Sequence, residues 1–571
     1  MSPTFLFDGE CGFCRHWTNY WKKLVGNRVL FQTLQDAGRD LTTARFITKD
    51  GIEYQGARAV AELLTFAPGK SWFRWLYLHV YPFASLSEWM YKRVASCRSC
   101  AAHATRLLWG KSLEPSTFLF TRRLFLRLLG LVYLIAFLSF FVQIPGLIGE
   151  HGLLPVGEYL ANAKAALGNS AYLHLPTLAW ISPSTSFLGF LSILGAAASL
   201  LAVIGIQLTP VFFLLWMLYL SLFYAGQTFM SFQWDIFLLE AGFLAIFFAP
   251  TRFGDKHDAP HLVVWLYRVL VFRLMFSSGF VKLASGDPTW RNLSALDYHY
   301  WTQPLPNTIS WFVHQLPGWA DRLSILFMFG VQLVLPFFIF APRRLRFFAA
   351  FGFIALELAI GLTGNYTFFN LLTISCVILL FDDQFFRRLP KKIPDVASHA
   401  QRRAAQMLTA VIVFLLLFHI PTSLRIVNSY GLFAVMTTER HEIILQGSND
   451  GETWLDYEFT YKPGDVHRAP GFVAPHQPRL DWQMWFAALS SYEQNPWFVH
   501  LAEALLRGTP EVTDLLATNP FAGDPPTYVR AALFDYRFTT AQERQETGAW
   551  WARESLGLYL PVASLERKTG D

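Results

Sequence analysis

Long apolar runs dominate the chain from Leu124 onward, whereas the residues before them alternate between polar and apolar in short stretches. An apolar helix of about 20 residues spans the hydrocarbon core of a bilayer. About nine such segments are predicted, near residues 124–148, 185–205, 210–226, 234–250, 262–283, 321–342, 345–362, 366–382 and 405–421. Several are short, so we expect some to tilt or re-enter. Residues 111–421 are therefore predicted to form a polytopic α-helical membrane domain.

Residues 1–110 show the pattern of a small α/β domain. PTFLFD at residues 3–8 predicts a short strand, and DGECGFCRHWTNYWKKL runs from a glycine-containing turn into a helix that begins near Cys11. We expect further strands and a helix at residues 29–32, 44–48 and 57–66, respectively. The order strand, C-x-x-C, helix predicts a thioredoxin-like domain.

Residues 422–571 are polar enough to form a soluble domain. HEIILQGSNDGETWLDYEFTYKP alternates on both sides of Asn449, Asp450 and Gly451, which predicts two strands joined by a turn. The rest of this segment mixes helix and strand signals and carries many aromatic residues. We expect a β-rich (α+β) domain that lies against the mouth of the membrane domain.

Composition agrees with a multi-domain membrane protein rather than a single soluble globule. Of 571 residues, 53% are hydrophobic and only 15% are charged, and the mean hydropathy is positive. The net charge of +6 is small for this length and gives no support to nucleic-acid binding. The partner that composition does indicate is the lipid bilayer.

Lysine and arginine are distributed unequally between alternate loops, which predicts orientation, because basic loops stay in the cytoplasm. One set of loops contains Arg106, Lys111, Arg122, Arg123, Arg252, Lys256, Arg343, Arg344, Arg346, Arg387, Arg388, Lys391, Lys392, Arg402 and Arg403. The opposite set contains Lys164 and Arg291. The N-terminus does not read as a signal peptide. We expect a bacterial cytoplasmic membrane, with the N-terminal domain inside and the C-terminal domain outside.

The cysteines include two C-x-x-C pairs in the first hundred residues. A helix N-terminus stabilises a thiolate at Cys11, and Cys14 lies one turn on to resolve a mixed disulfide. Cys97 and Cys100 form a second redox pair, or the four thiols bind zinc, although the 82 residues between the pairs exceed the spacing of a usual zinc ribbon. Redox or accidental pairing is favoured, and we predict no metal or cofactor.

The apolar run at residues 262–283 carries Arg268, Arg273 and Lys282, and buried charges in a membrane span indicate either function or structural pairing. Depth along neighbouring helices predicts that Asp235 pairs with Lys282 and that Arg273 reaches the level of Glu240. Glu357 adds a carboxylate in a later span. These residues form either a membrane site or a set of ion pairs that fix helix packing.

The phrase GDPTWRNLSALDYHYWTQPLPNTISWFVHQLP, which follows this run, resembles the signature of the lipase maturation factor family. The resemblance extends from about Arg123 to Leu565. It implies a membrane protein that helps an exported client enzyme, in the family a lipase, to mature. The loop residues that carry the signature are Asp287, Trp290, His299, Gln303, Pro304 and His314.

Two further resemblances concern the candidate chemistry. Residues 1–110 are similar to the DCC family of thiol-disulfide oxidoreductase-like domains, whose motif corresponds to Asp8, Cys11 and Cys14, although no proline directly precedes the strand expected at residues 44–48. GFVKLASGDPTW and GEHGLLP are similar to segments of vitamin K-dependent γ-carboxylase and its membrane relatives. That similarity implies that Lys282 is a catalytic base.

Three functions follow as alternatives: a maturation factor that works by contact, a membrane enzyme with Lys282 as its base, and a thiol redox relay from Cys11 and Cys14. The cysteine distribution separates the first from disulfide shuffling. Since both thiol pairs are predicted to lie inside, this chain is not expected to shuffle disulfides in an exported client. The sequence leaves the client, the electron donor and the oligomeric state open.

Overall fold

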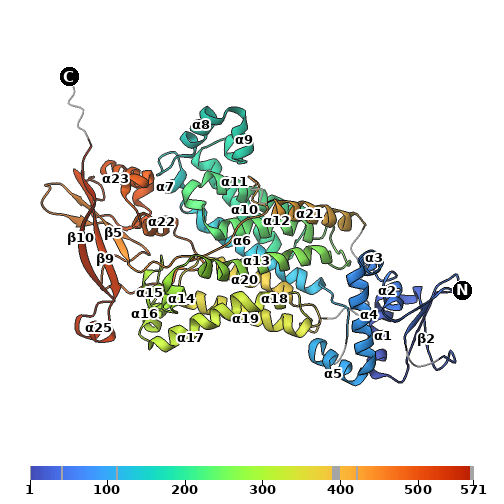
Figure 1. Cartoon of the computed structure of the whole chain (residues 1–571). Coiled ribbons are helices and arrows are strands. Elements are labelled where there is room, and N and C mark those ends of the chain that lie inside the picture. Colours follow the sequence, from blue (N-terminus) through green and yellow to red (C-terminus); the bar gives the residue numbers. More distant parts are fainter. Residues whose placement is uncertain (1, 40–42, 111–112, 389–398, 419–421, 566–571) are drawn as a thin grey trace.

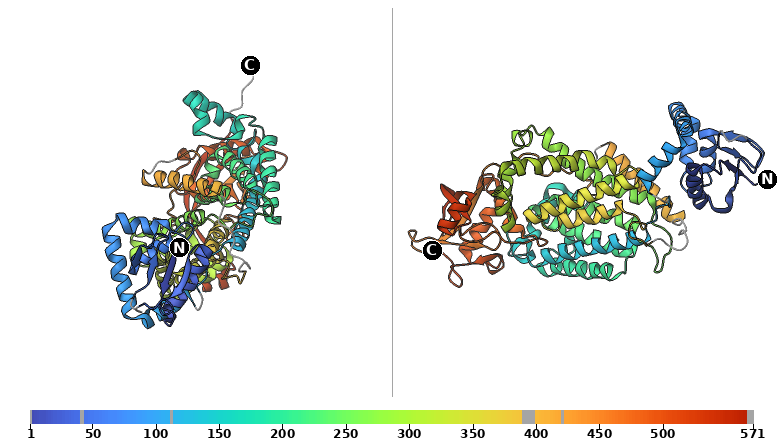
Figure 2. Two further views of the ribbon diagram at one scale, coloured as in Figure 1. Left: turned by 90° about the vertical axis from the view of Figure 1, so that its right-hand side faces the viewer. Right: turned by 90° about the horizontal axis from the view of Figure 1, so that it is seen from below.

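The computed structural model describes residues 2–39, 43–110, 113–388, 399–418 and 422–565. It shows an N-terminal region and a C-terminal region at opposite ends of a helical bundle (Figure 1), an arrangement that the further views confirm (Figure 2). Lys111, Lys391 and Lys392, which contributed to the predicted orientation, lie outside the described residues, as does the end of the segment expected at 405–421.

The N-terminal region is built on a four-stranded sheet with the order β2-β1-β3-β4. Its strands are β1 (Thr4–Phe7), β2 (Leu30–Thr33), β3 (Arg45–Ile47) and β4 (Glu53–Gln55), with α1 (Gly12–Val25) and α2 (Gly56–Leu64) between and after them. β1 runs parallel to β2 and antiparallel to β3, so Phe5 lies beside Phe31 and Phe46 in a small apolar core. The predicted strands and helix are confirmed. Three more helices follow: α3 (Ser71–His79), α4 (Tyr81–Ser96) and α5 (Arg98–Trp109).

Helices occur in all nine predicted apolar segments, but five are long and apolar enough to cross a membrane. These five are α6 (Leu119–Phe141), α10 (Thr185–Ile204), α13 (His261–Ala284), the α17–α18 segment (Gly318–Phe338) and α19 (Arg343–Thr363). Shorter helices are α11 (Thr209–Ala225), α12 (Gln233–Phe248), α20 (Phe369–Val377) and α21 (His399–Leu417). The protein is thus an integral membrane protein by helix length and composition.

Prolines explain two local departures from straight spans. The segment expected at 124–148 divides into α6 and the short α7 (Ile144–Ile148), because Pro145 lacks the amide proton that a continuing helix needs. Between α17 (Gly318–Phe329) and α18 (Leu335–Phe338), residues 330–334 form a π-helical turn directly before Pro336.

The loop after α13 is largely helical. It contains α14 (Pro288–Arg291), α15 (Ala295–Thr302) and α16 (Thr308–His314), and the side chain of Asn307 caps α16 in a reciprocal capping box with Ser310. The segment between α7 and α10 contributes α8 (Val156–Leu167) and α9 (Ala171–His174).

An antiparallel sheet with the order β10-β9-β5-β6 forms the centre of the C-terminal region. Its strands are β5 (His441–Ser448), β6 (Leu455–Asp456), β9 (Tyr528–Phe538) and β10 (Trp551–Ala563). The predicted hairpin is confirmed: β5 and β6 pair around a turn in which Gly451 has a φ of +77°. A two-stranded sheet, β7 (Glu458–Phe459) with β8 (Leu516–Thr518), and the helices α22 (Arg479–Ala487), α23 (Pro496–Arg507), α24 (Pro510–Thr513) and α25 (Ala541–Thr547) complete the region.

One continuous apolar core connects the membrane helices to the C-terminal sheet. Phe237 of α12, Trp482 of α22 and Leu445 of β5 belong to the same cluster of buried residues. The N-terminal region has a separate core. The C-terminal region and the bundle are therefore packed as one unit at the end far from the thiols.

Candidate functional site

Cys11 and Cys14 lie at the start of helix α1, directly after the turn that follows strand β1. Cys11 is the N-cap of α1, and its Sγ accepts a hydrogen bond from the backbone N–H of Cys14 at 3.3 Å. Both cysteines are free and half-buried. Burial, together with the neighbouring Cys11, raises the pKa of Cys14 to about 12, so this thiol stays protonated at neutral pH. The geometry is that of a partly accessible first thiol at a helix N-terminus with a protonated second thiol beside it.

Asp8, the third motif residue, fixes the turn that carries Cys11. Its Oδ1 accepts hydrogen bonds from the backbone N–H groups of Glu10 and Cys11 and from the amide of Gln35. Arg98 forms an ion pair with its Oδ2. Burial opposes the charge of Asp8, but the hydrogen bonds and Arg98 together lower the pKa of Asp8 below its ordinary value.

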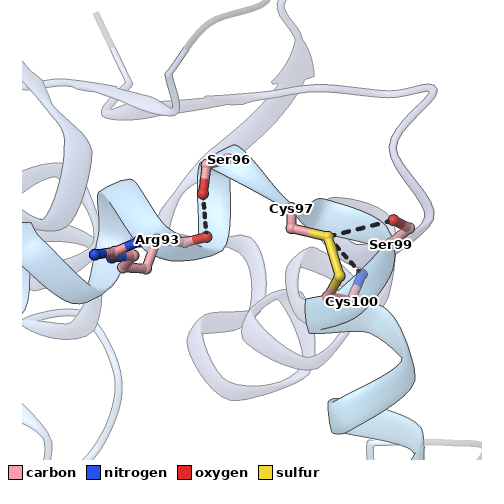
Figure 3. Close-up of a disulfide and its surroundings, with 5 residues drawn as sticks. All are labelled: Arg93, Ser96, Cys97, Ser99 and Cys100. Carbon is pink, nitrogen blue, oxygen red and sulfur yellow. Dashed lines mark hydrogen bonds between the residues drawn. A yellow bond between two sulfur atoms is a disulfide. The ribbon is translucent and has the colours of Figure 1, made fainter.

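The second cysteine pair is closed in the structure. Cys97 and Cys100 form a disulfide at the start of α5 (Figure 3). Arg98 lies between the two cysteines in sequence and forms the ion pair with Asp8. It also lines a small cavity together with Cys14, Trp21 and Tyr91. Arg98 therefore connects the segment that carries the disulfide to the turn that carries Cys11. Among the described residues, no three His, Cys, Asp or Glu side chains are grouped to hold a metal ion.

The predicted pairing of Asp235 with Lys282 is wrong. Asp235 instead accepts two hydrogen bonds from Arg479 of α22, at 2.9 and 3.1 Å, and one from the hydroxyl of Tyr219 at 2.6 Å. Depth along the helices placed Asp235 and Lys282 at similar levels, but it carries no information about a residue that enters from the C-terminal region. A guanidinium satisfies both carboxylate oxygens, which an ammonium does not.

The expected contact between Arg273 and Glu240 is present. Arg273 Nη1 lies 2.6 Å from Glu240 Oε1, and Oε2 accepts hydrogen bonds from Asn428 and from the hydroxyl of Tyr430. Glu357 lies apart from this cluster and accepts a hydrogen bond from Asn370 of α20 at 2.8 Å. The carboxylates proposed as one membrane site therefore occupy separate, individually satisfied positions.

Lys282 is 5% exposed near the C-terminal end of α13. Its Nζ donates to the carbonyls of Ser278 at 2.9 Å and Leu432 at 3.1 Å, and lies 3.4 Å from Gln332 Oε1. The ring of Trp290 covers the ammonium, with its centroid 5.3 Å from Nζ. Within the described ranges no carboxylate forms an ion pair with Lys282. Its contacts join α13 to the segment that leads into the C-terminal region.

The signature loop between α13 and α17 packs against the segment that leads into the C-terminal region. Asp287 Oδ2 accepts the backbone N–H of Met436 at 2.6 Å, and Trp290 donates to the carbonyl of Phe433 at 3.0 Å. The hydroxyl of Tyr366 donates a hydrogen bond to Gln303 Oε1 at 2.9 Å. The same hydroxyl oxygen lies 2.9 Å from His299 Nε2. These loop residues are thus brought together by packing between the bundle and the C-terminal region.

Two loop histidines are buried in this packing. Burial and the nearby Lys282 lower the pKa of His299 to about 4. Burial also lowers the pKa of His314, whose ring packs 5.8 Å from that of Phe538. Both imidazoles are therefore neutral at physiological pH.

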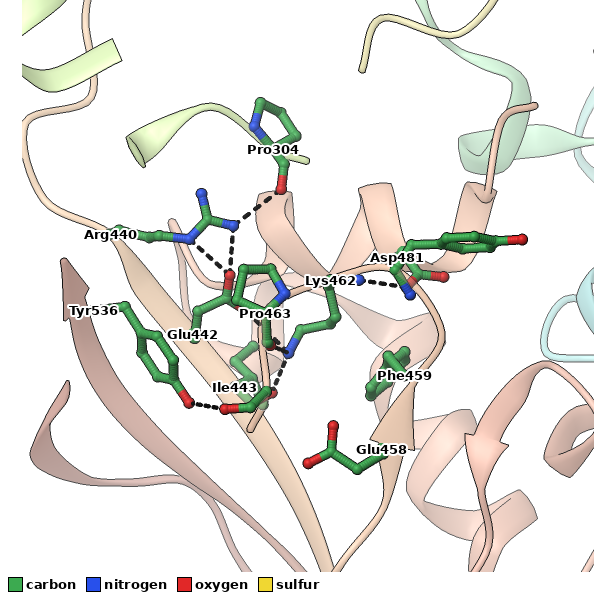
Figure 4. Close-up of polar contacts among 12 residues, drawn as sticks. Pro304, Arg440, Glu442, Ile443, Glu458, Phe459, Lys462, Pro463, Asp481 and Tyr536 are labelled. Carbon is green, nitrogen blue, oxygen red and sulfur yellow. Dashed lines mark hydrogen bonds and ion pairs between the residues drawn. The ribbon is translucent and has the colours of Figure 1, made fainter. Parts of the chain in front are cut away.

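Sequence reasoning missed a buried charge network in the C-terminal region (Figure 4). Arg440 donates to Glu442 Oε1 at 2.6 and 2.9 Å, and Lys462 Nζ lies 3.0 Å from Glu442 Oε2. Arg440 also donates to the carbonyls of Trp301, Gln303 and Pro304. These hydrogen bonds hold the loop after α15 against the start of β5. Glu442 is buried on the face of β5 opposite Ile443 and Leu445, and the sequence pattern of this strand gave no signal that its partners would be Arg440 and Lys462.

Family models match almost the whole chain. Residues 120–388 match the lipase maturation factor transmembrane domain, residues 426–561 the lipase maturation factor C-terminal domain, and residues 5–102 the DCC1-like thiol-disulfide oxidoreductase. No solved structure was found to match the chain.

Among curated proteins, the chain is 36% identical to mouse lipase maturation factor 1 over 80% of this chain and 89% of that protein. It is 35% identical to human lipase maturation factor 1 over 80% of this chain and 89% of that protein. For mouse lipase maturation factor 2 the identity is 34%, over 78% of this chain and 83% of that protein.

Proposed function

The chain belongs to the lipase maturation factor family, and we propose that it is a membrane-embedded maturation factor that helps an exported, lipase-like client enzyme to fold or assemble. One observation carries this proposal: the similarity covers the membrane helices, the signature loop and the C-terminal sheet together. In the structure the membrane helices and the C-terminal sheet share one core and are joined by the Asp235–Arg479 pair. The signature loop is held to the C-terminal region by the hydrogen bonds of Arg440.

The edge of the C-terminal sheet is the surface that best suits contact with a client. β10 is an edge strand of 13 residues, and no strand within the described residues pairs with its outer side. Leu556, Leu558 and Val562 are each about half exposed along it, at 49%, 51% and 51%. An exposed edge with apolar side chains can accept an extended segment of another chain by backbone pairing. Pro561 lacks an N–H, which restricts this pairing to the strand before it.

We propose the domain limits 1–110, 111–421 and 422–571, with nine spans that place the N-terminal domain in the cytoplasm and the C-terminal domain outside. The loop distribution of lysine and arginine supports this orientation. The positions of the two regions at opposite ends of the bundle agree with an odd number of crossings (Figure 1). Single cysteines introduced at Asp50 and Glu452 should react with an impermeant label from opposite sides. Labelling of both from one side would refute the arrangement.

The N-terminal domain would supply thiol–disulfide exchange on the cytoplasmic side through Cys11 and Cys14. Every C-x-x-C pair lies in the first 100 residues, so the exported client would be assisted by contact and not by disulfide shuffling. The membrane-enzyme alternative is less well supported, since Asp235 and Lys282 do not form a joint site.

Site-specific photocrosslinking in intact membranes tests the contact. A photoreactive residue at Leu558 should capture a specific exported hydrolase, whereas the same residue at Gln545, exposed on the nearby α25, should not. In parallel, Leu556→Asp/Leu558→Asp should lower the yield of active client while the factor remains folded. Equal capture at both positions, or full client yield with the double variant, would contradict the proposal for this edge.

A further inference from the structure

A pocket rich in arginine opens at the end of the bundle that faces the N-terminal region. It has a volume of about 220 Å³ and lies between the start of α6, the α10–α11 connection and the loop after α12. Four arginines line it: Arg122, Arg123, Arg127 and Arg252. Asp255 is the one carboxylate among the lining residues that the structure describes. The side chains that line the pocket therefore carry an excess of positive charge.

Arg122 is the buried member of this set. Its side chain is 2% exposed, and its Nη2 donates to the carbonyl of His257 at 3.1 Å. Its Nε and Nη1 are buried and have no acceptor among the described residues. Buried donor nitrogens are normally hydrogen-bonded, so the free Nε and Nη1 of Arg122 indicate a place for an acceptor. The oxygens of a phosphate group match the fork geometry of a guanidinium.

The acidic residues nearest to Arg122 are held by other donors. Asp255 accepts the backbone N–H and the imidazole of His257, and Asp258 accepts the N–H of Phe118 and contacts His261. Asp383 caps α6 by accepting the N–H groups of residues 119–121. None of the three forms an ion pair with Arg122 within the described residues. These three carboxylates reduce the positive electrostatic potential of the pocket, but they do not accept hydrogen bonds from Nε or Nη1 of Arg122.

The remaining arginines stand at the rim, exposed and without an ion-pair partner in the part of the chain that is described. Gly205 ends α10 with a φ of +114°, and a Cβ there would lie 3.2 Å from Arg127 Nη2. Glycine thus leaves room for the guanidinium of Arg127 at the mouth. Phe253, 73% exposed beside the pocket, supplies an aromatic side chain of the type found at membrane interfaces.

We propose that this pocket binds a phosphate group at the membrane face, with Arg122 as the buried donor and Arg127 and Arg252 as rim donors. Basic pockets between membrane helices on the cytoplasmic side are suited to phosphate-bearing groups. The phosphate belongs either to the headgroup of an anionic lipid or to a small soluble phosphate ester.

Binding to the purified full chain in a neutral detergent tests this proposal. Three probes separate the sources: dihexanoyl phosphatidylglycerol, dihexanoyl phosphatidylcholine as the lipid without net charge, and glycerol 1-phosphate. Arg127→Gln/Arg252→Gln changes exposed side chains only, so the fold should be retained. Arg403→Gln removes a charge from another exposed arginine, on α21 outside the pocket, and is the matched control.

We expect saturable binding of phosphatidylglycerol, weakened at least about tenfold in the double variant and unchanged in the control, since each charge-assisted contact contributes on this scale. Glycerol 1-phosphate binding as tightly as the lipid would assign the site to a soluble ester, and much weaker binding would assign it to a lipid headgroup. Equal affinity of the wild type and the double variant for both anionic probes, or an equal loss in Arg403→Gln, would overturn the proposal.

Discussion

Asp235 in α12 and Arg479 in α22 form a fully buried ion pair across 244 positions of sequence. Arg479 Nη2 lies 2.9 Å from Asp235 Oδ1, and the same guanidinium donates to the carbonyl of Phe229. The pair lies within the core that connects the membrane helices to the C-terminal sheet. It therefore links the position of the C-terminal region to a helix of the bundle.

Removing one partner of this pair should be far more costly than removing both. Arg479→Met leaves the Asp235 carboxylate buried without a cation, and we expect a loss of about 3–5 kcal/mol. Asp235→Leu/Arg479→Met should recover much of that loss, because no unpaired charge remains. Thermal unfolding in detergent measures both effects. The exposed pair Glu503–Arg507 is the control, and its removal should cost less than about 1 kcal/mol; an equally small cost for Arg479→Met would contradict the argument.

Lys282→Met should destabilise the junction between α13 and the C-terminal region. The substitution takes the Nζ donor away from the Leu432 carbonyl, whereas the Ser278 carbonyl keeps its helical N–H partner, and an unpaired buried carbonyl costs roughly 1–3 kcal/mol. Client yield should then fall in proportion to the amount of folded factor. Both quantities are measured in the same membranes, by detergent thermal stability and by activity of the exported client. Normal stability with no active client would instead support Lys282 as a catalytic base.

Much of the fold was predictable, because it depends on local patterns. The strands around Cys11, the hairpin at Gly451 and the apolar helices each follow from periodicity and turn chemistry. The partner of Asp235 was not predictable in this way, since Arg479 lies in another region and periodicity says nothing about contacts between regions. Span number is similarly underdetermined: α12 carries Asp235 and Glu240 and is 16 residues long, so length and hydropathy alone do not make it a crossing.

The burial of His299 predicts a pH-dependent loss of stability where the loop after α13 packs against the C-terminal region. Its pKa of about 4 in the folded protein lies below the unfolded value of about 6.5, so the folded state disfavours protonation. The stabilisation is complete above pH 6.5 and is lost as the pH falls from 6.5 to 4, by at most roughly 3 kcal/mol. His299→Gln should flatten this part of the stability curve, whereas His151→Gln, at an exposed loop position, should leave it unchanged. A wild-type curve that is flat between pH 6.5 and 4 would show that His299 is not held neutral.

Cys11 should be alkylated well before Cys14 in the reduced protein. Burial and the neighbouring Cys11 raise the pKa of Cys14 to about 12, so only about one molecule in ten thousand carries the Cys14 thiolate at pH 8. Mass spectrometry after timed iodoacetamide treatment of a Cys97→Ser/Cys100→Ser variant measures the two rates separately. Cys376, buried within the bundle, is an internal control that should react only after unfolding.

Asp8→Asn should speed the labelling of Cys14, because the Asp8 carboxylate is one of the charges that raise the Cys14 pKa. Equal and slow labelling of Cys11 and Cys14 would mean that the motif builds a structural turn and not a redox site.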